Sequence, residues 1–123
     1  MNREEICNLS DKEIDRLIAE KWMRWKYANN YYVPDCWITN KSSSPTSFMP
    51  STNISDAMEA LEKFPKSKYA IVLTRNINNE WLVYVETQNI NDEFQIKVMG
   101  DDKSLPKAIC QCICLYLNEK GEL

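Results

Sequence analysis

Apolar and polar residues follow three helical patterns and three strand patterns along the chain. The first helical pattern places Ile14, Leu17, Ile18, Trp22 and Trp25 on one face. Ahead of it, Ser10 and Glu13 have the spacing of a capping box, in which each side chain satisfies the backbone N–H of the other at a helix start. The pattern therefore predicts a helix over residues 11–25 that packs one face against a core.

A second helix is predicted after the segment PSTN. Either Thr52 or Asn53 suits its N-cap, because both side chains accept hydrogen bonds from the first turn, and Pro65 ends it. Its apolar stripe consists of Ile54, Ala57, Met58, Leu61 and Phe64.

A third helix is predicted near the end of the chain. Ser104 or Leu105 opens it together with Pro106, since proline is well tolerated in the first turn. Asn118 and Gly121 end it. Its buried face contains Ile109, Cys110, Ile113 and Leu117, with Cys114 as a further candidate and Cys112 pointing away.

Between the second and third helices, three β-favouring runs alternate with short polar turns. They cover residues 68–75, 81–87 and 93–99, and the sequence GDDKSLP is expected to end the last one. Such a succession predicts an antiparallel meander. The fold class is therefore α+β, with a small three-stranded antiparallel meander between helical layers, an α-β-α sandwich. Because the meander has two exposed edges, we expect a homodimer or a higher homo-oligomer.

The chain of 123 residues is expected to form a single domain over 1–123, with two segments outside the regular patterns. Residues 1–9 form a polar lead-in. Residues 27–52 form a long loop rich in aromatic residues, which follow neither a helical nor a strand period. Ordered loops of this length are usually functional, so this one is expected to bind something.

Charge and composition exclude several classes of function. A net charge of -3 argues against a DNA-binding protein. The apolar runs are too short to cross a membrane, and the beginning of the chain lacks a signal-peptide core, so a cytoplasmic protein is expected. The five cysteines and the absence of histidine favour reduced thiols and disfavour metal sites, cofactors and nucleophilic catalysis.

Four segments in order resemble the phage ABA-sandwich domain family, over roughly residues 9–118. They are LSDKEIDRLIAEKWMRWKY, a loop ending FMPSTNISDAMEALEKF, the strand WLVYVE, and SLPKAICQCICLYL. Two positions depart from the family pattern. Asn53 replaces an acid at the start of the second helix, and Glu80 replaces a glycine before Trp81.

The sequence is also similar to phage anti-defence proteins that counter the Thoeris system. The resemblance implies a homo-oligomeric sponge that sequesters glycocyclic ADP-ribose, a cyclic nucleotide messenger, without cleaving it; some members also hold cyclic oligonucleotides. The protein is then expected not to be an enzyme and to act in the cytoplasm of the infected bacterial host.

Such a ligand needs apolar plates for its base, polar groups for its riboses, and cations or helix-start N–H groups for its phosphates. Two places in the sequence offer these groups: the loop with its exit, and the start of the third helix. The predicted ligand-binding residues are Phe48, Asn53, Trp37, Ser51, Thr52, Arg24, Arg75, Ser104 and Lys107.

Structural roles compete with binding at several of these positions. Thr52 and Asn53 are also natural helix caps. Phe48 could fix the entry of the second helix. Arg24 could complement the helix dipole, and Arg75 could be an ordinary charge at a strand end.

Two other classes of function remain open from the sequence. The aromatic loop could dock on a host defence protein and inhibit it. Alternatively, Glu20, Asp35 or Glu86 could support a phosphodiesterase-like enzyme that degrades the messenger, although no carboxylate pair and no Gly-rich phosphate loop stands out.

Overall fold

A computed structural model describes residues 1–28, 36–39, 45–88 and 94–123. The first part of the chain contains α1 (Arg3–Cys7), α2 (Asp11–Leu17), the π-helical turn η1 (Ile18–Trp22), β1 (Lys26–Ala28), β2 (Cys36–Ile38), β3 (Thr46–Ser47) and α3 (Ile54–Leu61). The second part contains β4 (Ala70–Arg75), β5 (Trp81–Gln88), β6 (Phe94–Asp102) and α4 (Leu105–Glu119). The strands form two antiparallel three-stranded sheets, ordered β1-β2-β3 and β4-β5-β6.

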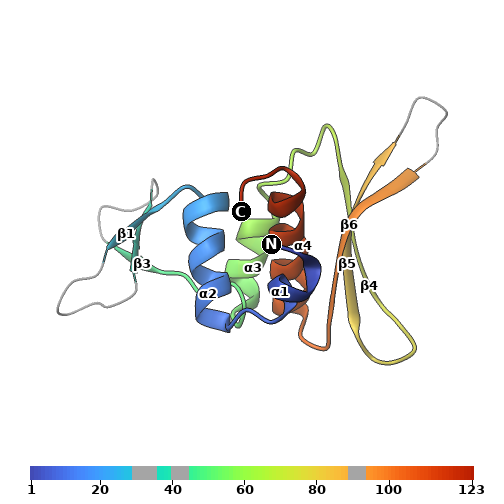
Figure 1. Ribbon diagram of the computed structural model, residues 1–123, viewed down its shortest axis with the longest axis horizontal. Coiled ribbons are helices and arrows are strands. Elements are labelled where there is room, and N and C mark those ends of the chain that lie inside the picture. The colour runs from blue at the N-terminus through green and yellow to red at the C-terminus, as the bar shows by residue number, and fades with distance from the viewer. Residues whose placement is uncertain (29–35, 40–44, 89–93) are drawn as a thin grey trace.

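The α+β class and the predicted antiparallel meander are confirmed. Figure 1 shows the helices in the middle of the molecule, with the small sheet β1–β3 beside α2 and the meander β4–β6 beside α4. On the inner face of the meander, Val83 and Val85 have no exposed surface. The core therefore lies between the meander and α4, and continues through α4 to α2 and α3.

The three predicted N-caps hold their helices as expected. Ser10 Oγ accepts a hydrogen bond from the Glu13 N–H at 3.2 Å, and Asn53 Oδ1 accepts one from the Asp56 N–H at 3.0 Å. Ser104 Oγ accepts one from the Lys107 N–H at 3.4 Å. Local side-chain chemistry thus set where these helices begin.

The first long helix is shorter than the apolar pattern predicted. It ends at Trp22 in a π-helical turn, because Arg24 adopts a left-handed backbone with φ of 62° and turns the chain toward β1. Trp22 still packs in the core, where its ring lies 4.8 Å from that of Phe64 and its Nε1–H donates to the Ala60 carbonyl at 2.7 Å.

The polar lead-in predicted for residues 1–9 contains a helix. Asn2 caps α1 by accepting from the Glu5 N–H, and Ile6 is fully buried in the core. Arg3 fixes the helix to β6 by donating to the Met99 carbonyl at 2.7 Å and to Asp101 at 2.8 Å. The polar composition of this segment does not predict a packed helix, because only one buried isoleucine and a long-range ion pair hold the helix in place.

The predicted aromatic loop 27–52 contains the three short strands of the first sheet. Tyr27 pairs with Trp37 between β1 and β2, and Cys36 pairs with Ser47 between β2 and β3. Strands of two or three residues are too short to show a period of two, so their sequence does not predict them. Residues 29–35 and 40–44 of this segment, including Tyr31, Tyr32 and Asp35, lie outside the described residues.

The last strand extends beyond its predicted end. The sequence GDDKSLP was expected to end the strand at its first residue, but β6 continues through Gly100 to Asp102. A Cβ at Gly100 would lie 2.2 Å from the Ala108 carbonyl oxygen and 2.7 Å from the Cys112 nitrogen. The glycine therefore serves close packing of β6 on α4 rather than a turn.

α4 is buried around most of its circumference, which corrects the one-sided prediction. Cys112, predicted to point away from the core, has no exposed surface, as is also true of Cys110 and Cys114. The meander covers one side of α4 and the other helices cover the opposite side (Figure 1). In α3, by contrast, Ile54 and Met58 of the predicted stripe are 44% and 40% exposed.

Candidate functional site

A cleft of about 680 Å³ opens between the start of α2 and the sheet β1–β3. Its volume lies in the range of small-molecule sites, about 300–1,000 Å³. Its lining comes from α2 and its cap, from the sheet, and from the segment that enters α3: Ser10, Asp11, Lys12, Glu13, Asp15, Arg16, Tyr27, Trp37, Ser47, Phe48, Met49 and Thr52.

Aromatic rings form the apolar part of the cleft. The Tyr27 and Trp37 rings meet edge to face with centroids 5.2 Å apart, and Phe48 packs in the same way on Trp25 at 4.8 Å. Trp37 and Phe48 are only 4% and 3% exposed, so neighbouring side chains hold both rings in place. The half-buried Tyr27 ring therefore offers more apolar surface to a planar ligand group than these two rings do.

Among the described residues, the cations that line the cleft are Lys12 and Arg16, neither of which was predicted from the sequence to bind a ligand. The Arg16 guanidinium lies over the Tyr27 ring, 4.7 Å from its centroid, and its Nε donates to Glu20 at 3.1 Å. A spacing of four residues puts Lys12 and Arg16 on one side of α2. This spacing shows in the sequence that the two cations share one side of the helix. The sequence does not show that the sheet β1–β3 lies opposite that side.

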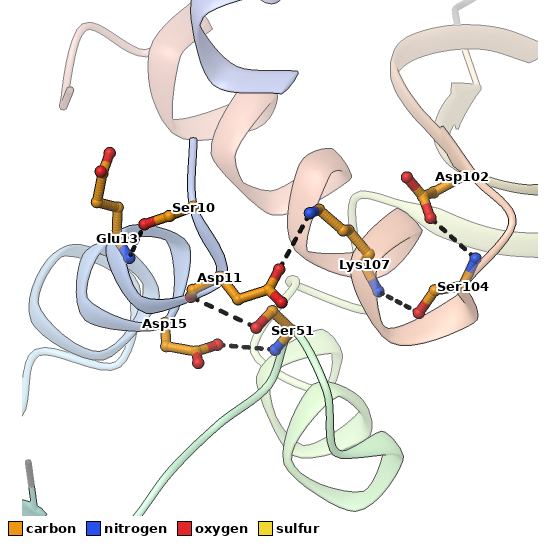
Figure 2. A network of polar contacts seen from close by, with 8 residues as sticks. All are labelled: Ser10, Asp11, Glu13, Asp15, Ser51, Asp102, Ser104 and Lys107. Carbon is orange, nitrogen blue, oxygen red and sulfur yellow. Dashed lines mark hydrogen bonds and ion pairs between the residues drawn. The ribbon is translucent and has the colours of Figure 1, made fainter. Parts of the chain in front are cut away.

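A polar network joins the two places where the sequence predicted ligand binding (Figure 2). The Ser51 N–H donates to Asp15 Oδ1 at 2.8 Å, and the Ser51 hydroxyl donates to the Asp11 carbonyl at 3.4 Å. From the other side, Lys107 Nζ donates to the Asp11 carboxylate at 3.0 Å. The exit of the aromatic segment and the start of α4 therefore meet at the start of α2.

Two groups of this network have shifted pKa values. Burial raises the pKa of Asp15 above its ordinary value of 3.8, and the hydrogen bonds from Ser51 offset part of that rise. The hydrogen bond to Asp11 raises the pKa of Lys107, which keeps the amine protonated. The Asp11–Lys107 pair is partly exposed, at 51% and 27%, so it contributes little to stability by itself.

The predicted binding residues fall into three groups. Trp37, Phe48 and Thr52 line the cleft, and Ser51 bonds to one of its carboxylates. Ser104 caps α4 and Lys107 extends from its first turn to Asp11 (Figure 2), while Asn53 caps α3. Arg24 and Arg75 do not line the cleft.

Those two arginines have partners elsewhere in the fold. Arg24 lies 3.7 Å from Glu122 near the end of the chain and is 71% exposed. Arg75, at the end of β4, stacks 5.2 Å from the Trp81 ring and hydrogen-bonds Asn79 in the turn that follows. The interpretation of Arg75 as a charge at a strand end agrees with this position.

Of the residues considered for catalysis, the two that the structure describes, Glu20 and Glu86, belong to different elements, η1 and β5. Glu20 bonds to Arg16, Glu86 belongs to β5 and does not line the cleft, and Asp35 lies outside the described residues. Within the described parts of the chain, no group of three potential ligands could hold a metal ion. Burial raises the pKa of Cys112 and of Cys114 to about 12, which keeps both thiols protonated.

The family model of the phage ABA sandwich domain matches residues 16–112, which is more than half of the chain. No curated protein and no solved structure gives a significant match. Of the helices that the structure describes, none is long and apolar enough to cross a membrane. With a family match over most of its length and the α+β fold that the resemblance implied, the chain belongs to the phage ABA sandwich domain family.

Proposed function

We propose that this phage protein binds and sequesters a cyclic ADP-ribose-type immune messenger, such as glycocyclic ADP-ribose, without cleaving it. The observation that carries the proposal is the cleft of about 680 Å³, whose lining combines aromatic rings with the cations Lys12 and Arg16. A sponge that binds at nanomolar concentration needs roughly -12 kcal/mol, which requires an enclosing site rather than single surface contacts. The cleft supplies the concave shape that such binding needs.

Each part of the ligand has a matching group. The adenine packs against the half-buried Tyr27 ring, which the buried Trp37 ring supports from behind. Lys12 and Arg16 bind the phosphates. The Arg16 guanidinium gives up its bond to Glu20 and donates to a phosphate oxygen instead. Thr52 and Ser47 offer hydroxyls to the riboses.

The proposal includes assembly of several copies in the cytoplasm of the infected host. Strands β4 and β6 are the edges of the meander in the described chain, and a second copy that covers or pairs with an edge would remove unpaired backbone groups. Arg75, which does not line the cleft of its own chain, is then a candidate to reach a neighbouring subunit.

The test mixes the purified protein with the messenger made by TIR enzymes, separates bound from free ligand, and then denatures the complex by heat. Intact messenger in the released fraction is the expected result. Degraded messenger would identify an enzyme and refute sequestration. Retention is then compared for Arg16→Gln and for the matched variant Arg24→Gln, both of which remove one guanidinium from an exposed ion pair.

Arg16→Gln is expected to weaken messenger binding at least about tenfold, because a charge-assisted bond to phosphate is lost. Arg24→Gln is expected to bind as the wild type does if the cleft of one chain suffices. Loss of binding in Arg24→Gln with full binding in Arg16→Gln would move the site away from the cleft.

A protein-binding function is the second candidate, and one observation favours it. Met49, at the rim of the cleft, and Ile54 and Met58, on α3, are 50%, 44% and 40% exposed. Flexible methionines of this kind occur at surfaces that dock on other proteins. A protein that neither retains nor degrades the messenger would favour this function.

A further inference from the structure

The cleft contains a half-buried carboxylate whose presence phosphate binding does not explain. Asp15 projects from α2 and lines the cleft, where Oδ1 accepts the Ser51 N–H at 2.8 Å. Figure 2 shows the Asp15 carboxylate beside Ser51, with one of its two oxygens bonded to the Ser51 N–H. A carboxylate accepts about four hydrogen bonds, so acceptor positions remain on Asp15 after the Ser51 contact.

A negative charge at this point selects the group that can lie next to it. Asp11 and Asp56 act on Asp15 by like-charge repulsion, and burial already disfavours its ionised form. A phosphate placed there would add a further negative charge. A hydrogen-bond donor would instead compensate the carboxylate, as a donor does for any partly buried anion.

The neighbouring rings indicate which donor reaches Asp15. The rings of Tyr27, Trp37 and Phe48 line the same cleft as Asp15, so a base bound among them lies beside the polar side chains of α2. The edge of adenine carries a 6-amino group, which donates hydrogen bonds and accepts none. Asp and Glu read exocyclic amino groups of bases in this way in other protein complexes.

Resting on the proposed function, we infer that Asp15 is the residue that selects the base: its carboxylate accepts a hydrogen bond from the 6-amino group of adenine in the bound messenger. The ligand class is therefore an adenine nucleotide with an unsubstituted amino group. In the hypoxanthine form of the same messenger, an oxygen acceptor replaces that amino group. This oxygen and the Asp15 carboxylate would then be two acceptors that face each other with no donor between them.

The first test needs no variant. Binding of the adenine messenger and of its hypoxanthine form to the wild-type protein is measured by titration calorimetry. We expect the adenine form to bind about tenfold or more tightly, the effect of one base-edge hydrogen bond. Equal binding of the two forms, or tighter binding of hypoxanthine, overturns the inference and leaves the proposed function standing. Binding of neither form overturns the proposed function as well.

The second test uses Asp15→Asn. The amide oxygen of asparagine keeps an acceptor for the Ser51 N–H, and its NH₂ group then turns a donor toward the ligand. The preference is expected to reverse toward hypoxanthine. Glu62→Gln is the charge-matched variant, because Glu62 is 67% exposed, pairs with Lys66 and does not line the cleft. An unchanged preference in Asp15→Asn, or the same reversal in Glu62→Gln, contradicts a direct contact with the base.

Discussion

Replacing Gly100 by alanine tests how closely β6 packs on α4. The new Cβ would lie 2.2 Å from the Ala108 carbonyl oxygen and 2.7 Å from the Cys112 nitrogen, and both are backbone atoms of α4. A flexible side chain could move away, but a helix backbone moves only if the packing on its other side changes. Overpacking of a core typically costs about 1–3 kcal/mol, and the contact with backbone places this variant near the upper end, at about 3 kcal/mol.

The magnitude is large enough for a routine assay. For a domain of this size, about 3 kcal/mol corresponds to a loss of roughly 10 °C in Tm. In urea it corresponds to a shift of about 1.5 M in the midpoint at an unchanged m value. Tryptophan fluorescence can follow the transition, since Trp22 and Trp81 both pack against the core.

Gly121→Ala is the matched control, because its cost has a different origin. Gly121 has φ of +75° and nothing lies within 4 Å of a Cβ placed there. The expected loss is the strain of a left-handed backbone alone, about 1 kcal/mol. If Gly100→Ala were no more destabilised than Gly121→Ala, β6 and α4 would not be in the close contact described, and the reasoning would be refuted.

Two further predictions concern titratable groups. Cys110, Cys112 and Cys114 are buried and have raised pKa values. A thiol reagent at mildly alkaline pH should therefore leave these three thiols unmodified in the folded protein and label them after denaturation. Labelling of the three at the same rate as the partly exposed Cys7 would contradict their burial. Burial raises the pKa of Asp15 above 3.8 in the folded state, so the folded protein binds a proton more tightly than the unfolded chain does. Relative to Asp15→Asn, the free energy of unfolding of the wild type should therefore fall as the pH rises from below 3.8 toward neutrality. If urea denaturation gave the same difference in free energy of unfolding between the two proteins across that range, the raised pKa of Asp15 would be refuted.

Features that depend on neighbours in the sequence were predicted well. Ser10, Asn53 and Ser104 each accept from an N–H three residues later, and no distant residue is needed for that bond. The meander follows from three β-favouring runs separated by short turns, because antiparallel neighbours need little connecting chain. The amino-acid sequence by itself thus determined the starts of α2, α3 and α4, the meander and the α+β class.

The candidate site was predicted only in part. Trp37, Phe48 and Thr52 were recognised from their residue types and do line the cleft. Lys12 and Arg16 were not predicted to bind a ligand, whereas Arg24 and Arg75 were predicted to do so and do not line the cleft. A cation on a helix surface looks the same in sequence whether it faces solvent or a cleft.

Only the tertiary structure decided what stands opposite each helix. It brought Lys107 to Asp11 across 96 positions of sequence and Ser51 to Asp15 across 36. It also made Gly100 a contact of β6 with α4 rather than a turn. Caps and strand runs arise from short-range bonds that the local sequence specifies, whereas a cleft arises where separate elements pack, and its lining depends on contacts between residues far apart in the chain.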